Sequence, residues 1–213
     1  MDFVFFVLEI IGAISFSISG ALTAIKKNMD VFGACVLGMT TAIGGGIMRD
    51  LILGVNPPVA FINPTQAIIG FTLPVIFYLP KTQKILIPNT HKSHDVCLLI
   101  ADSIGLGVFT VVGVSASFDV LINPNVFTAV FLGAMTGIGG GILRDTLSLT
   151  LPKVFVKHFY ACASILGALV TYFSRFLFGI LASTILGIIV VLVLRILAST
   201  LHWKLPKPNC NFQ

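Results

Sequence analysis

Charged residues are scarce in this sequence. Lys, Arg, Asp and Glu make up 10% of its 213 residues, whereas a soluble domain carries about 25%. So few charges cannot cover the surface of a water-soluble protein, which excludes a soluble globular domain. Instead, 56% of the residues are hydrophobic, and they form long uninterrupted blocks of about the 20 residues that a helix needs to cross a bilayer. We therefore expect an all-α integral membrane protein with the lipid bilayer as its main partner.

Several chemical motifs are also missing. The four Cys form no CxxC pair and lack the His spacing of a metal site. The apolar blocks contain no Ser–His pair and no His/Glu cluster, and no glycine-rich run carries the Lys of a phosphate-binding loop. We therefore expect no enzymatic activity, no metal site and no cofactor. The first apolar block, residues 3–25, lacks a basic leader because Asp2 is the only early charge, so we interpret it as a permanent span rather than a signal peptide.

Seven transmembrane spans can be drawn along the chain. Asn, Pro and Lys interrupt the apolar blocks, and these residues form turns or anchor a chain at the membrane interface. The predicted spans cover residues 3–25, 31–54, 64–80, 96–117, 126–151, 155–174 and 176–200. Only Ser174-Arg175 separates the last two spans, but residues 157–200 have twice the length that one crossing needs.

Basic residues fall almost entirely on one side of this topology. The side with the C-terminus and the loops after the first, third and fifth spans collects nine lysines, and the other side has only Arg175. Because basic loops are retained in the cytoplasm, we expect a multi-pass inner (plasma) membrane protein with its N-terminus outside and its C-terminus cytoplasmic. This distribution accounts for the net charge of +5 without a nucleic-acid partner.

The sequence contains an internal repeat. Residues 38–50 read GMTTAIGGGIMRD and residues 133–145 read GAMTGIGGGILRD, with nine of thirteen positions identical. Three spans per copy is an odd number, so the second copy must be inserted in the opposite orientation, as in many transporters. We expect a first three-helix repeat (residues 1–90), a second, inverted three-helix repeat (91–174), and an extra seventh helix with a cytoplasmic tail (175–213).

Each repeat carries a glycine triplet near the middle of its second span. Glycine destabilises a helix interior by about 1 kcal/mol relative to alanine, so a triplet favours local unwinding, with backbone carbonyls lining a water-filled path. The alternative is close helix packing, since small residues let backbones approach each other. The candidate hinge and pore residues are Gly44, Gly45, Gly46, Gly139, Gly140 and Gly141.

Ionisable residues inside the spans are the second candidate feature, because such residues usually pair within the bundle interior. Matching their depths predicts two ion pairs, Glu9–Arg49 and Asp102–Arg144. Residues adjacent on a helix do not face each other, so Asp50 and Asp145 should have other partners. These carboxylates either face a pathway and attract cations, with the pairs acting as gates, or belong to a neutral structural network. For Arg195, snorkelling to the interface is a sufficient explanation.

The doubled GGGxxRD motif in a chain of seven predicted spans resembles the prokaryotic branch of the trimeric intracellular cation (TRIC) channels, over about residues 3–200. The resemblance implies a homotrimer with one potassium-permeable pore per subunit. It also implies that the second and fifth spans bend at their glycines to line the pore. By position, Gly44–Gly46 and Gly139–Gly141 would form the hinges, and the polar residues around the pore would be Arg49, Asp50, Arg144 and Asp145.

The resulting hypothesis is a monovalent cation channel that passes K⁺ or Na⁺. The alternative is a secondary transporter of a small zwitterion such as glycine, because inverted repeats with broken helices also suit alternating access. A third hypothesis is a non-transporting assembly or sensor subunit. A carrier saturates and turns over slowly, whereas an open pore passes ions at far higher rates, so saturation separates the first two.

Overall fold

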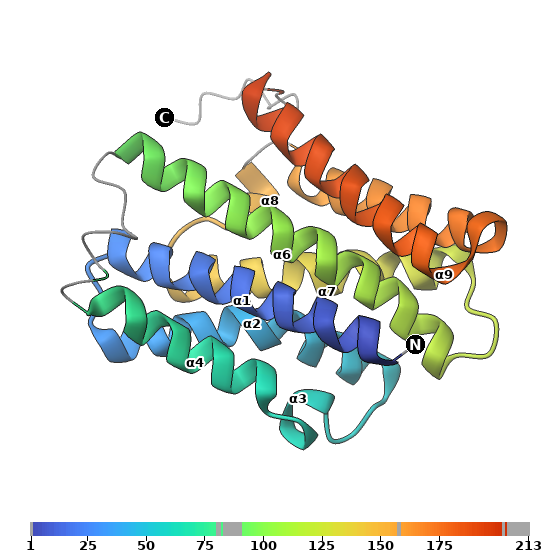
Figure 1. Cartoon of the computed structure of the whole chain (residues 1–213), viewed down its shortest axis with the longest axis horizontal. Helices are drawn as coiled ribbons and strands as arrows, with labels where there is room; N and C mark the ends of the chain where they lie inside the picture. Colours follow the sequence, from blue (N-terminus) through green and yellow to red (C-terminus); the bar gives the residue numbers. More distant parts are fainter. Residues whose placement is uncertain (1, 80–81, 83–90, 157–158, 202, 204–213) are drawn as a thin grey trace, which may run out of the picture.

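The structure of the chain is a computed structural model that describes residues 2–79, 82, 91–156, 159–201 and 203. The regular elements of these residues are all helices (Figure 1), namely α1 (Asp2–Lys26), α2 (Val31–Leu53), α3 (Val59–Ile62), α4 (Thr65–Tyr78), α6 (His91–Val120), α7 (Val126–Leu147), α8 (Lys153–Val156) and α9 (Tyr160–Thr200). The predicted repeat boundary at residue 90 and the predicted tail from residue 204 lie outside the described residues.

The lengths and hydropathy of the helices confirm an all-α, multi-pass membrane protein. Within the described ranges, five helices are long and apolar enough to cross a bilayer, namely α1, α2, α6, α7 and α9. Helix α4 has 14 residues, which at about 1.5 Å per residue is shorter than the roughly 30 Å hydrocarbon core. The short helix α3 precedes it across the loop at Asn63 and Pro64.

The helix ends follow local sequence signals. Asp30 accepts a hydrogen bond from the backbone N–H of Gly33 at 2.7 Å, and Asn125 accepts one from that of Thr128 at 2.8 Å. These side chains cap α2 and α7 and satisfy backbone donors that have no partner within the helix. Helix α7 ends at Leu147, four residues before the predicted end of the fifth span.

The last two predicted spans meet at Gly179, and the predicted break at Ser174-Arg175 is wrong. Helix α9 continues through both residues and leaves helical geometry only at Gly179, where φ is 78°. This left-handed backbone favours glycine, which explains why the turn occurs there. The two segments pack against each other, because Gly167 lies against Val191 and Gly187 lies against Thr171. Each segment has about the 20 residues of one crossing.

Helices α1 and α6 lie side by side in the bundle, in front of α2 and α7 in the view of Figure 1. Helix α1 packs on α2, α4 and α6, while α6 packs on α1, α7 and α9, and α2 and α7 contact each other extensively. The rings of Phe16 (α1) and Phe109 (α6) stack with centroids 5.2 Å apart. Gly105 makes room for the Phe16 ring and Gly12 for the Phe109 ring, so the same contact is made twice.

Candidate functional site

The two glycine triplets meet where α2 crosses α7. A Cβ atom on Gly45 would overlap the backbone carbonyl of Thr136, and a Cβ on Gly140 would overlap that of Thr41. Each threonine precedes the glycine of its own helix by four residues, so the two helices make equivalent contacts with each other. The absence of side chains at both glycines lets the backbones approach, as in other membrane helix pairs.

The predicted unwinding at the triplets is wrong for this structure. Helix α2 is continuous from Val31 to Leu53, and α7 is continuous from Val126 to Leu147. Close packing replaces the expected break, because backbone contact across the helix pair compensates for the low helix propensity of glycine. The broken helices that the transporter alternative requires are therefore not formed within α2 or α7.

The outer members of the triplets have different surroundings. A Cβ on Gly139 would lie 3.0 Å from the Met48 sulfur, and one on Gly141 would lie 2.7 Å from the Tyr160 hydroxyl. Gly44 faces the flexible end of Leu143. Gly46 has open space, since the nearest atom to its Cβ position is the Arg49 Nη2 at 4.0 Å.

The first group of charges is the Glu9 cluster, which we define as Glu9 (α1), Arg49 and Asp50 (α2), and Gln66 (α4). The predicted Glu9–Arg49 pair is confirmed, with Arg49 Nη1 3.9 Å from Glu9 Oε1. Gln66 Nε2 donates to Glu9 Oε2 at 3.0 Å. The Glu9 side chain remains 22% exposed, so this cluster is only partly closed.

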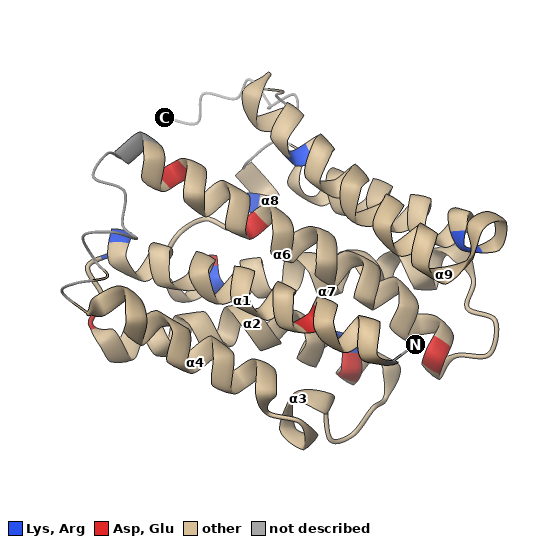
Figure 2. Cartoon of the chain, viewed as in Figure 1, with Lys and Arg blue, Asp and Glu red and all other residues tan. Residues whose placement is uncertain are grey.

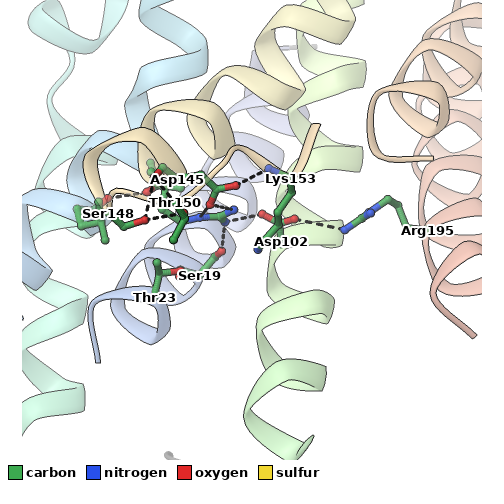
Figure 3. A network of polar contacts seen from close by, with 11 residues as sticks. Ser19, Thr23, Asp102, Asp145, Ser148, Thr150, Lys153 and Arg195 are labelled. Atoms are coloured by element: carbon green, nitrogen blue, oxygen red, sulfur yellow. Dashed lines mark hydrogen bonds and ion pairs between the residues drawn. The ribbon is translucent and has the colours of Figure 1, made fainter. Parts of the chain in front are cut away.

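The second group is the Asp102 cluster, which we define as Asp102 (α6), Arg144 and Asp145 (α7), and Arg195 (α9). The predicted Asp102–Arg144 pair is confirmed, with Arg144 Nη1 2.5 Å from Asp102 Oδ1. The same nitrogen donates to Ser19 Oγ of α1, so residues of four helices converge here (Figure 3). Both side chains of the central pair are 0% exposed.

Asp50 and Asp145 each bind the adjacent arginine, which contradicts the premise that neighbours on a helix do not meet, and each also has the further partner that was predicted. Nε and Nη2 of Arg49 contact Asp50 Oδ1 at 2.8 Å, and those of Arg144 contact Asp145 Oδ1 at 2.9 and 2.7 Å. The long arginine stem lets the guanidinium fold back over its own helix. The second carboxylate oxygen of each Asp accepts the backbone N–H of the first residue of α3 or α8 at 2.8 Å.

Arg195 does not snorkel to the interface, which corrects the explanation based on its position alone. Its side chain is 4% exposed, and Nη2 lies 3.4 Å from Asp102 Oδ2. Its guanidinium carbon lies 4.4 Å from the centre of the Tyr160 ring, a cation–π geometry. Unpaired charges are energetically unfavourable in this interior. Asp102 is the acidic partner of Arg195 that the sequence alone could not assign.

Three participants were not predicted from the sequence, namely Ser19, Gln66 and Tyr160. The only signal for Gln66 is an amide near the start of an apolar span, and Ser19 is one of several small residues on α1. Figure 2 shows that charged residues are few along the helices and lie at separate places in the bundle. On α1, Glu9 belongs to one cluster and Ser19 contacts the other, and this separation corresponds to about 15 Å along a helix.

Sequence comparison assigns the chain to a family. The sequence model of a family described as Glycine transporter matches residues 6–80 and 99–175. The UPF0126 inner membrane protein YadS of Escherichia coli K12 is 35% identical over 201 residues, which cover 93% of each chain. The UPF0126 membrane protein YvgT of Bacillus subtilis is 32% identical, over 93% of this chain and 94% of its own.

Comparison with solved structures shows which proteins share both the sequence and the fold of this chain. A chain from a study of conductance through TRIC cation channels is 36% identical, with a TM-score of 0.82 over 97% of this chain and 98% of its own. A prokaryotic TRIC channel crystallised in 0.5 M KCl is 29% identical, with a TM-score of 0.86 over 96% of this chain and 100% of its own. The chain belongs to the prokaryotic TRIC family. The TRIC orthologue of Rhodobacter sphaeroides, 27% identical with a TM-score of 0.83 over 94% of this chain and 99% of that one, shares this fold.

Proposed function

We propose that this chain is a potassium-permeable cation channel with one conduction pathway in each subunit of a homotrimer. The observation that carries the proposal is the similarity, in sequence and fold, to TRIC cation channel structures over nearly the whole chain. The TRIC orthologue of Rhodobacter sphaeroides is described as trimeric. The expected permeant ions are K⁺ and Na⁺, and no resident cofactor is needed for conduction.

The proposed architecture has seven crossings, arranged as two inverted three-helix repeats and one extra helix. Helices α1, α2 and α4 would form the first repeat, and α6, α7 and the first segment of α9 the second. The paired contacts support this symmetry, because Gly45 meets Thr136 as Gly140 meets Thr41. The distribution of lysines supports an external N-terminus and a cytoplasmic C-terminus.

The proposed pathway runs along α2 and α7, with a charge cluster at each end. Carboxylates at both ends would attract cations, and backbone carbonyls near the glycines would replace part of their hydration shell. At the crossing, the contact between Gly45 and Thr136 has no room for a methyl group. We propose that this helix contact loosens when ions pass, and that the present structure is a closed arrangement.

Transport of glycine is the second candidate, because the matching family model carries that description. Transporters of this architecture hold substrate at the ends of broken helices. Helices α2 and α7 are continuous through their triplets, so no such ends are formed there.

The direct test is single-channel recording of the purified chain in planar bilayers under a KCl gradient. We expect discrete current steps that reverse near the K⁺ equilibrium potential. Glu9→Gln should reduce cation over anion permeability, because it removes a partly exposed carboxylate. Asp119→Asn is the matched control, since Asp119 is exposed at the end of α6 and belongs to neither cluster. Silent bilayers together with saturable glycine uptake into liposomes would refute the channel.

A further inference from the structure

The carboxylates of the two clusters differ in their second partner. At Glu9, one oxygen faces Arg49 and the other accepts a hydrogen bond from the neutral amide of Gln66. At Asp102, one oxygen faces Arg144 and the other faces a second guanidinium, that of Arg195. The first carboxylate therefore has one cationic partner, and the second has two.

Arg195 is held less tightly than Arg144. It contacts Asp102 through a single nitrogen at 3.4 Å, whereas Arg144 approaches to 2.5 Å and also binds Ser19 and Asp145. The buried Nε of Arg195 has no hydrogen-bond partner among the described residues. An unsatisfied buried donor is unfavourable, so Arg195, although it also lies over the Tyr160 ring, is the more weakly hydrogen-bonded of the two guanidinium groups.

The difference in partners changes the charge at the two ends of the proposed pathway. The Glu9 cluster contains two carboxylates and one guanidinium, so its net charge is negative. In the Asp102 cluster two carboxylates are balanced by two guanidinium groups, and Lys153 adds a positive charge that acts on Asp102. The position that would attract a permeant cation at Asp102 is therefore already occupied, by a cation that belongs to the protein.

We propose that Arg195 is a tethered cation that competes with permeant cations for Asp102 and thereby limits conduction at this end. The inference rests on the proposed channel function. Arg195 lies in the α9 segment after Gly179, outside the two proposed repeats, so it can be added to one end of a symmetric pathway without a counterpart at the other. It is a positioning residue, since it acts through the charge of Asp102.

The test is Arg195→Gln, which gives Asp102 the kind of neutral partner that Gln66 provides to Glu9. We expect the K⁺ current to rise about tenfold, because removing one positive charge beside Asp102 raises the local concentration of cations. The reciprocal variant Gln66→Arg should lower the current, because it places a second guanidinium beside Glu9. Arg195→Lys retains the charge and should behave like wild type.

The control for a general effect on α9 is Arg175→Gln. Arg175 lies on the same helix, but it stacks on Phe118 at 4.4 Å and contacts no member of either cluster. Its replacement should leave the K⁺ current unchanged. All variants are purified in detergent, and only those that elute from size-exclusion chromatography like wild type are compared.

A chemical rescue separates the loss of the cation from a change in packing. In Arg195→Ala, added methylguanidinium should occupy the vacated position and suppress the raised K⁺ current, whereas wild type should not respond. A current in Arg195→Gln equal to that of wild type, or an Arg195→Ala current insensitive to methylguanidinium, would overturn the inference while leaving the channel intact. Silence of wild type and all variants would refute the channel itself, and the inference with it.

Discussion

Gly45→Ala should destabilise the protein, whereas Gly46→Ala, one residue further on, should not. At Gly45 an added Cβ overlaps the Thr136 carbonyl oxygen and lies 3.0 Å from its carbon, and these backbone atoms cannot rotate away. At Gly46 the nearest atom is 4.0 Å away. The two positions share one helix and one level of the bundle, so their comparison isolates the contact across α2 and α7.

The magnitudes follow from two opposing effects. Replacing glycine by alanine in a helix interior stabilises by about 1 kcal/mol, and this gain applies to both variants. Overpacking costs roughly 1–3 kcal/mol, and it applies only at Gly45. The difference between the variants therefore equals the steric effect alone, and we expect the upper part of that range because the clash is with backbone. Gly140→Ala, which meets the Thr41 carbonyl, should resemble Gly45→Ala.

Thermal unfolding of the purified variants in detergent, followed by circular dichroism, measures this difference. We expect a lower midpoint for Gly45→Ala than for wild type, and an equal or higher midpoint for Gly46→Ala. Equal midpoints for the two variants would refute the argument that α2 and α7 are held in backbone contact at their glycines.

Three further predictions concern the charged residues. Arg144→Gln should destabilise by about 3–5 kcal/mol, because it removes the buried guanidinium that Asp102 and Asp145 share. Arg49→Gln should cost less, because one of its two partners, Glu9, is partly exposed; equal unfolding midpoints would contradict this. Asp145→Asn should speed amide hydrogen exchange at Lys153, the first residue of α8, because the Asp145 carboxylate accepts a hydrogen bond from this N–H. An unchanged exchange rate would show that this hydrogen bond does not hold the loop. Lys26→Ala should change stability by less than about 1 kcal/mol, because its 2.7 Å pair with Asp95 is half-exposed, and a larger, salt-independent loss would be inconsistent with this.

The ion pairs between helices could be predicted because depth in the membrane is readable from sequence. Glu9 and Arg49 were expected to pair from their equal distances to the membrane surface, and so were Asp102 and Arg144, and the structure places both pairs in contact. The third partner at Asp102 could not be predicted. Arg195 also suits an interfacial position by depth, and only the packing of α9 on α6 decides between the two.

Whether the helices unwind or pack closely at the glycine triplets could not be predicted either, because the low helix propensity of glycine is compatible with both. The outcome depends on what faces each glycine on the neighbouring helix. Here the backbone carbonyls of Thr136 and Thr41 face Gly45 and Gly140, in place of water. The turn at Gly179 was missed for a related reason. No polar residue marks it within its apolar segment, whereas Arg175, which marks the predicted break, is accommodated inside the helix by the Phe118 ring.

The sequence by itself determined the membrane class, the long apolar helices, the repeated GGGxxRD motif and the pairs of opposite charges. These features follow from the lengths of the apolar segments, their hydropathy and the identity of single residues. The tertiary structure decided which backbone faces each glycine and how many guanidinium groups each carboxylate contacts. These features depend on contacts between residues far apart in the chain, such as Asp102 with Arg195. Such contacts arise from the way whole helices pack, and no local segment encodes them.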